Sequence, residues 1–202
     1  MHMPAKLEVI TGPMFSGKSA ELIRLLNRAT YARKKILVIK PSIDHRSGEN
    51  RIAERAIKNG KSAVVEDFPA FSIGTLEEFW HLVNKNDFDV LAIDEAQFFT
   101  QPWFVSVDFI AAVQELLDKH SQEDFRIIIA GLDMTAQMEP FGPMPQLLAM
   151  ADEVTKLTAV CFNCGATARY TQILGGTGEE IQVGDLDLYE ARCRKCHVKN
   201  KT

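Results

Sequence analysis

The sequence predicts an α/β fold with a central parallel β-sheet flanked by helices, followed by a small cysteine-containing domain. Short apolar runs alternate with segments of helical spacing, as expected for strands joined by crossover helices. The motif G-x-x-x-x-G-K-[ST] at residues 12–19 lies between such a run and a helical pattern, which is the context it requires. All four cysteines follow residue 158, where the alternation stops. We therefore predict one domain over residues 1–158 and a second over 159–202.

The elements follow from apolar spacing. Runs rich in Ile, Leu and Val predict strands at 7–10, 36–39, 88–93 and 127–130, and a last core strand near 154–160. Apolar residues at helical spacing predict helices at 20–26, 107–117 and near 145–151. The polar, charged segment 41–61 predicts a loop, with a possible short helix at 52–57.

Composition limits the class of partner. The chain has 202 residues, 46% of them hydrophobic, enough for one sizeable core and a small appendage. A net charge of -4 and a pI near 5.8 argue against a nucleic-acid polymer and leave small anions as partners. No stretch approaches 18 apolar residues, and residues 1–6 lack the apolar core of a signal peptide. We expect a cytoplasmic protein with no membrane contact.

The loop Gly12-Pro13-Met14-Phe15-Ser16-Gly17-Lys18-Ser19 predicts a nucleotide site. Two glycines let the backbone bend so that N–H groups and the helix N-terminus point at phosphate oxygens. Lys18 adds positive charge at the β- and γ-phosphates, and the Ser19 hydroxyl is a candidate Mg²⁺ ligand. The alternative is an accidental Gly-rich turn, which the flanking strand and helix disfavour.

An acidic pair ends the predicted strand 88–93, in the run Asp94-Glu95-Ala96-Gln97. Beside a phosphate loop, one carboxylate serves Mg²⁺ and another accepts the proton of the attacking nucleophile. We assign the metal role to Asp94 and the catalytic role to Glu95. The alternative is a solvated or capping acidic pair, which the independent phosphate loop makes less favourable.

The cysteines form two C-x-x-C pairs, Cys161 with Cys164 and Cys193 with Cys196. Four thiolates in this pattern suit a structural tetrahedral Zn²⁺. Two disulfides are disfavoured in a reducing compartment, and a redox C-x-x-C is disfavoured because neither pair opens a helix after the first strand. His197 is a competitor of Cys196 for the fourth ligand position.

With these motifs the chain resembles the zinc-containing (type II) thymidine kinases of bacteria and animal cytosol. The resemblance runs from Gly12 to Cys196. It rests on the motifs at 12–19, Asp94-Glu95-x-Gln97-Phe98-Phe99, Pro140-Phe141-Gly142, Lys156 to Cys161 and Tyr189 to Cys196. It implies a RecA-like P-loop core and a zinc domain whose long lasso loop covers the nucleoside. It also implies transfer of the γ-phosphoryl group of ATP to the 5′-hydroxyl of thymidine, inhibition by thymidine triphosphate, and a homotetramer.

The resemblance also implies roles for individual residues. It implies that Glu95 is the proton acceptor. It also implies that ATP and Mg²⁺ are bound by the whole loop 12–19 together with Asp94, Glu95, Ala96, Gln97, Asp44 and Arg46. The nucleoside is assigned to Met14, Phe98, Phe141, Thr171, Gln182, Gly184 and Tyr189. Glycines in the lasso, pinned at both ends by zinc, suit a mobile lid. Phe99 and Phe104 are expected to be ordinary core residues.

Two residues depart from the pattern of the family. Ala136 stands where members usually have an aromatic residue, so a surface for stacking the base is expected to be lost. Asp185 replaces a second glycine in the lasso. Two other functions remain open on the residues: a nucleic-acid-stimulated ATPase, since the acidic run also resembles a helicase motif, and a zinc-stabilised ATP-binding regulatory module.

Overall fold

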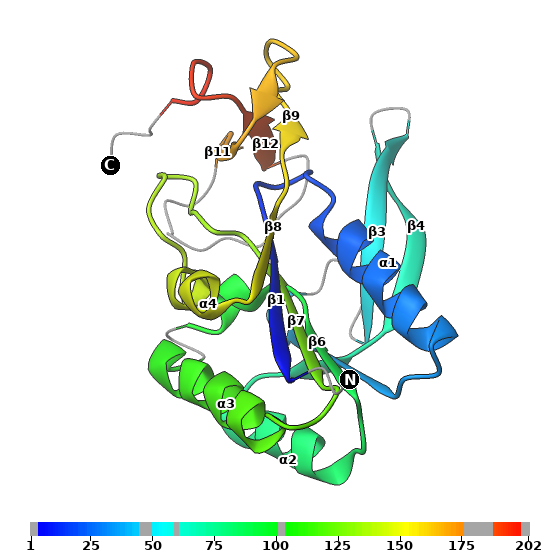
Figure 1. Ribbon diagram of the computed structural model, residues 1–202. Coiled ribbons are helices and arrows are strands. Elements are labelled where there is room, and N and C mark those ends of the chain that lie inside the picture. Colours follow the sequence, from blue (N-terminus) through cyan, green and yellow to red (C-terminus); the bar gives the residue numbers. More distant parts are fainter. Residues whose placement is uncertain (1–3, 45–49, 59–60, 101–103, 176–187, 199–202) are drawn as a thin grey trace.

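The computed structural model describes residues 4–44, 50–58, 61–100, 104–175 and 188–198 (Figure 1). Its centre is a parallel six-stranded sheet in the order β5-β2-β6-β7-β1-β8. The strands are β1 (Lys6–Thr11), β2 (Ile36–Pro41), β5 (Phe71–Ile73), β6 (Val90–Ile93), β7 (Arg126–Gly131) and β8 (Glu153–Lys156). The predicted α/β class, a parallel sheet flanked by helices, is confirmed, with β7 lying between the strand that leads into the phosphate loop and the strand that leads into the acidic pair.

Each face of the sheet is covered by helices (Figure 1). Successive side chains of a strand point to opposite faces. In β7, Ile127 and Ile129 therefore pack with α2 (Leu76–Lys85), α3 (Ser106–Lys119) and α4 (Met144–Met150). Ile128 joins the other core, which is formed with α1 (Lys18–Tyr31) and the hairpin of β3 (Arg51–Lys58) and β4 (Lys61–Pro69). Both faces are buried, which explains the unbroken apolar runs.

The prediction for residues 51–58 was wrong. Residues 51–58 form β3, antiparallel to β4, and so the segment 52–57 is a strand and not a helix. Ile52 is fully buried against α1, while Val64 and Val65 of β4 are exposed. The hairpin packs against α1 on one side only, so few of its residues need to be apolar. Its sequence therefore gave little indication of a strand.

Among the strands of the six-stranded sheet and the four α-helices, two elements were not predicted. Strand β5 is short and lies at one edge of the sheet. Helix α2 begins after Thr75, whose hydroxyl accepts a hydrogen bond from the backbone N–H of Glu78. The Glu78 carboxylate in turn accepts from the N–H of Gly74 at 2.7 Å. This Thr-x-x-Glu capping pattern was a readable signal of the helix.

The C-terminal part contains two small antiparallel hairpins. They pair β9 (Ala159–Val160) with β10 (Thr167–Ala168) and β11 (Tyr170–Ile173) with β12 (Tyr189–Arg192). The predicted strand 154–160 is thus interrupted, because its first half is β8 of the main sheet and its second half is β9. The domain boundary at residue 158 remains a prediction that coincides with this change of sheet. Within the described ranges, no helix has the length and apolar character needed to cross a membrane.

Candidate active site and metal centre

The phosphate loop joins β1 to α1 at the carboxyl edge of the sheet. Gly12 has φ +150°, and a Cβ at this position would lie 2.6 Å from the carbonyl oxygen of Leu157. Gly17 has φ +85° and precedes the first helical residue. The sequence prediction of a strand, a bent loop and a helix is confirmed, and the N-terminus of α1 is directed as an anion site requires.

Two side chains of the loop are held on this edge. The ammonium group of Lys18 is buried and donates to the carbonyl oxygen of Pro13 at 2.9 Å. The hydroxyl of Ser19 donates to Asp94 at 3.1 Å. The sheet therefore brings the hydroxyl and the carboxylate together, although they are 75 residues apart. A hydroxyl and a carboxylate at this separation are a donor set that fits Mg²⁺.

Negative charge is concentrated around Asp94. Burial, followed by the neighbouring charges of Glu95 and Asp44, raises the pKa of Asp94 to about 7. The buried ammonium group of Lys40 donates to the backbone carbonyl of Asp44 at 2.8 Å and lies 4.0 Å from its carboxylate. Three neighbouring buried carboxylates, of Asp44, Asp94 and Glu95, favour binding of a cation. Asp44 thus lies in the site as expected, while Lys40 was not predicted to be there.

Glu95 has a constrained position. Its backbone lies in the left-handed region, at φ +53°, and its N–H donates to the Asp94 carboxylate at 3.0 Å. Its own carboxylate accepts from the amide of Gln97. The Gln97 carbonyl oxygen accepts from the N–H of Leu132 at 2.9 Å, and Gln97 is fully buried. One amide therefore connects the candidate base to the segment that follows β7.

The predicted aromatic residues separate into two groups. Phe98 and Phe141 form an edge-to-face pair with centroids 5.8 Å apart, and Phe141 is on the segment after β7. Phe99 stacks on Phe109 and contacts Phe104 inside the core, as expected of ordinary packing residues. Phe98 is close to Glu95, because its backbone N–H donates to the Glu95 carbonyl at 3.1 Å. The stacking of Phe99 on Phe109 attaches the end of η1 (Ala96–Phe98) to α3.

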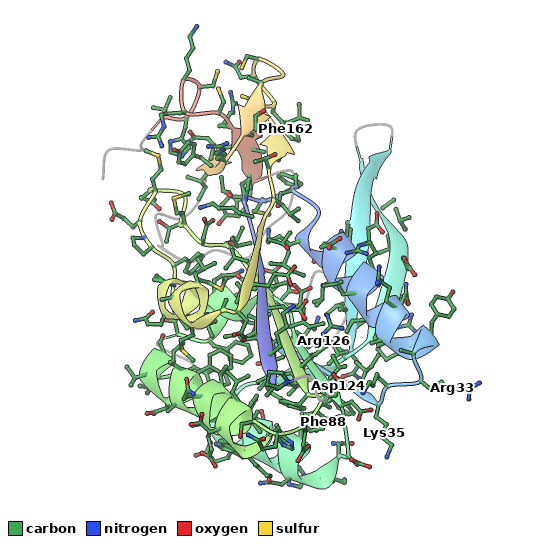
Figure 2. All side chains as sticks on the ribbon, in the orientation of Figure 1. Arg33, Lys35, Phe88, Asp124, Arg126 and Phe162 are labelled. Carbon is green, nitrogen blue, oxygen red and sulfur yellow. The ribbon has the colours of Figure 1, made fainter. Side chains whose placement is uncertain are left out.

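The C-terminal part contacts the phosphate loop directly. The backbone N–H of Met14 donates to the hydroxyl of Thr171 at 3.0 Å. The ring of Phe15, at φ +63°, packs on Phe162 with centroids 5.6 Å apart. Figure 2 shows Phe162 at the end of the molecule where β9 and β12 lie, and Arg126 toward the opposite end. Phe162 was not predicted to lie here, because nothing in its neighbouring sequence indicates a contact with the distant phosphate loop.

The four cysteines converge as predicted. Their sulfur atoms all lie within 4.8 Å of one another, and those of Cys164 and Cys193 are 3.7 Å apart. Tetrahedral zinc with Zn–S bonds of ~2.3 Å places its sulfur atoms about 3.8 Å apart, so the cluster fits this ion. Burial acts to raise the pKa of Cys161, but backbone N–H donors from Cys193, Asn163 and Cys164 lower it to about 6.

His197 is outside the four-sulfur cluster. Its Nε2 atom is 2.9 Å from the carbonyl oxygen of Ala136 and 3.2 Å from that of Thr171. The fourth position therefore goes to Cys196, and the competing assignment to His197 is not favoured. Tyr189 is buried on β12, opposite Ile173. Four predicted residues, Arg46, Gln182, Gly184 and Asp185, lie outside the described residues.

Comparison with known proteins agrees with these motifs. The family model for thymidine kinase matches residues 5–197. A thymidine kinase of Bdellovibrio bacteriovorus is 42% identical over 199 residues, which cover 98% of this chain and 88% of that protein. A thymidine kinase of Mesomycoplasma hyopneumoniae is 40% identical over 191 residues, covering 95% and 94%.

Among solved structures, a DNA replication initiation factor aligns with 75% of this chain and 40% of its own at a TM-score of 0.44 and 14% identity, a likeness too distant to carry an argument. The family model and the relatives, by contrast, extend over the phosphate loop, the acidic pair and the cysteine cluster. This chain belongs to the thymidine kinase family.

Proposed function

We propose that the protein transfers the γ-phosphoryl group of ATP to the 5′-hydroxyl of thymidine, giving ADP and thymidine monophosphate. The observation that carries the proposal is the placement of Glu95. It lies beside the Ser19–Asp94 pair and is bonded through Gln97 to the segment that bears Phe141. A proton acceptor is thus next to both a candidate metal pair and an apolar aromatic pair.

In the proposed reaction, Glu95 accepts the proton of the 5′-hydroxyl as its oxygen forms a bond to the γ-phosphorus. The bond between that phosphorus and the β,γ-bridging oxygen breaks, and ADP leaves with the electron pair. The backbone of residues 12–17 binds phosphate oxygens, and Lys18 leaves the carbonyl of Pro13 to bind them too. Ser19 and Asp94 would hold Mg²⁺, which supplies charge neutralisation at the phosphates. Asp44 and Arg46 are proposed to assist at the metal and phosphates.

For the nucleoside we propose a pocket that includes the Phe98–Phe141 pair and the junction of Met14 with Thr171. An edge-to-face aromatic pair provides an apolar wall, and the thymine ring is flat and weakly polar. Tyr189, with Gln182 and Gly184 of the lasso, is proposed to complete the enclosure. Zinc held by the four cysteines would fix both ends of the segment between Cys164 and Cys193, which contains the lasso.

Family membership also supports four further proposals. The active form is a homotetramer, thymidine triphosphate is a feedback inhibitor, the protein works in the cytoplasm, and it needs neither a nucleic-acid polymer nor a membrane. Each is a separate claim. Sedimentation, inhibition kinetics, cell fractionation and assays with added DNA test them one at a time.

The decisive experiment replaces the candidate base. Glu95→Gln keeps the shape of the side chain but removes the proton acceptor, so turnover with thymidine is expected to fall ~10²-fold or more while ATP affinity stays near normal. Glu77→Gln on the exposed surface of α2 is the matched control and keeps wild-type turnover. ADP release is measured with thymidine, with other deoxynucleosides, with single-stranded DNA and without acceptor. Turnover in Glu95→Gln equal to that of the control would contradict the proposed role.

A further inference from the structure

His197 lies immediately after the last cysteine of the zinc cluster, and its ring contacts two segments outside the metal turn. Nε2 is within hydrogen-bond distance of the carbonyl oxygens of Ala136 and Thr171, at 2.9 and 3.2 Å. Carbonyl oxygens only accept hydrogen bonds. Nε2 must therefore carry the hydrogen and share it between the two oxygens.

The ring is fixed from the metal side. The backbone N–H of His197 donates to the carbonyl of Cys193 at 2.9 Å, which closes the turn between the last two cysteines. The ring is next to that of Tyr170, with centroids 5.6 Å apart, and the following N–H, of Val198, donates to the side chain of Gln172 at 2.7 Å. Its direction is thus determined by the metal turn and by β11.

The two acceptors belong to two segments that we assigned to the proposed nucleoside pocket. Thr171 holds the N–H of Met14, so it positions the phosphate loop. Ala136 is on the segment 132–143, which also carries Phe141 and whose first N–H is held by Gln97. Through these contacts, His197 joins the two segments to each other and to the zinc turn.

We propose that His197 is a positioning residue for the nucleoside: by donating one shared hydrogen bond to Ala136 and Thr171, it fixes the spacing of the pocket walls relative to the zinc turn. This inference rests on the proposed function, since it takes the pocket to be the thymidine site. Through His197, the zinc turn would influence nucleoside binding independently of the lasso.

A positioning role for His197 predicts different effects of substitution from a role in metal binding or in overall folding. Loss of the donor leaves two carbonyl oxygens without this bond and loosens the segment 132–143, which keeps its contact with Gln97. The Thr171 hydroxyl keeps its bond to Met14, so the phosphate loop keeps its geometry. The KM for thymidine should therefore change while the KM for ATP does not. Zinc content should not change, because no atom of His197 belongs to the four-sulfur cluster.

The test compares two substitutions in the full-length zinc-loaded protein. His197→Leu removes the donor and is expected to raise the thymidine KM about tenfold, with kcat and the ATP KM within about twofold of wild type and one zinc per chain. His197→Gln keeps an N–H donor and is expected to restore most of the affinity. Loss of zinc in His197→Leu, equal changes in both KM values, or no difference between the two variants would overturn the proposal.

A second measurement does not depend on the substrate. Nitrogen-15 NMR of the histidine rings distinguishes the two neutral tautomers, and His197 is expected to carry its hydrogen on Nε2. A hydrogen on Nδ1 alone would overturn the proposed bonds whatever the enzyme phosphorylates. Wild-type protein that phosphorylates only another nucleoside would instead contradict the proposed function, and the same variants would then be compared with that nucleoside.

Discussion

Gln97 is the residue whose replacement tests the geometry of the candidate base most directly. Its amide has two separate contacts: the oxygen accepts from the N–H of Leu132 and the nitrogen donates to the carboxylate of Glu95. The side chain is fully buried. Two substitutions of similar size remove these contacts in different combinations, so the contribution of each can be measured.

Gln97→Met removes both contacts. A buried N–H left without its partner costs about 1–3 kcal/mol. For a chain of this size 1 kcal/mol corresponds to roughly 2–4 °C in Tm, so a loss of about 2 kcal/mol lowers Tm by about 4–8 °C. Glu95 also loses a group that orients its carboxylate, and turnover is expected to fall about tenfold.

Gln97→Glu keeps an oxygen for Leu132 but places a second carboxyl beside Glu95. Two adjacent buried carboxyls share a proton, so ionisation of the pair is shifted to higher pH. The acid limb of the kcat profile should move up by about one unit or more. Because the pair binds a proton more tightly in the folded state, stability is near normal at low pH and is lost as pH rises. An unshifted acid limb in this variant, or wild-type stability and turnover in Gln97→Met, would refute the reasoning.

Three other predictions concern the metals and the base pocket. Purified protein should contain about one zinc per chain, and Cys164→Ser should lose it and weaken thymidine binding more than ATP binding; active protein free of zinc would rule this out. The pKa of Asp94 is raised from 3.8 to about 7, so wild-type stability without Mg²⁺ should decline as pH rises across that interval. Asp94→Asn should remove the decline and be more stable than wild type at pH 8, and parallel pH curves would count against it. Ala136→Phe should lower the thymidine KM by up to about tenfold, and an unchanged KM with unchanged tolerance of 5-substituted analogues would show that position 136 does not face the base.

The sheet and the chemistry-bearing motifs could be predicted because their signals are local. A strand buried on both faces, such as Ile127 to Ala130, is an apolar run in any context, and the phosphate loop is defined by eight consecutive residues. The pairing of Ser19 with Asp94 follows once both are placed at the carboxyl edge of one parallel sheet. The C-x-x-C spacing likewise specifies a cluster before any fold is known.

The remaining features depend on contacts between distant segments. The hairpin β3–β4 has few apolar residues, and its burial comes from α1 on one side only, so charge dominated the prediction. His197 was considered only as a zinc ligand, since no sequence pattern indicates that its ring reaches Ala136. Lys40 follows the predicted strand 36–39 and was given no role, and only the fold shows it buried beside Asp44.

The position of β1 has a consequence for the order in which the chain acquires structure. The strand is the first in the chain, yet both of its neighbours in the sheet, β7 and β8, are synthesised late. Thr171, which forms a hydrogen bond with Met14 in the phosphate loop, is 157 residues from it. During synthesis, β1 must remain unpaired until residues 126–131 have left the ribosome, exposing an apolar segment for most of translation. The nascent chain is therefore expected to need a chaperone longest at the strand that leads into the phosphate loop.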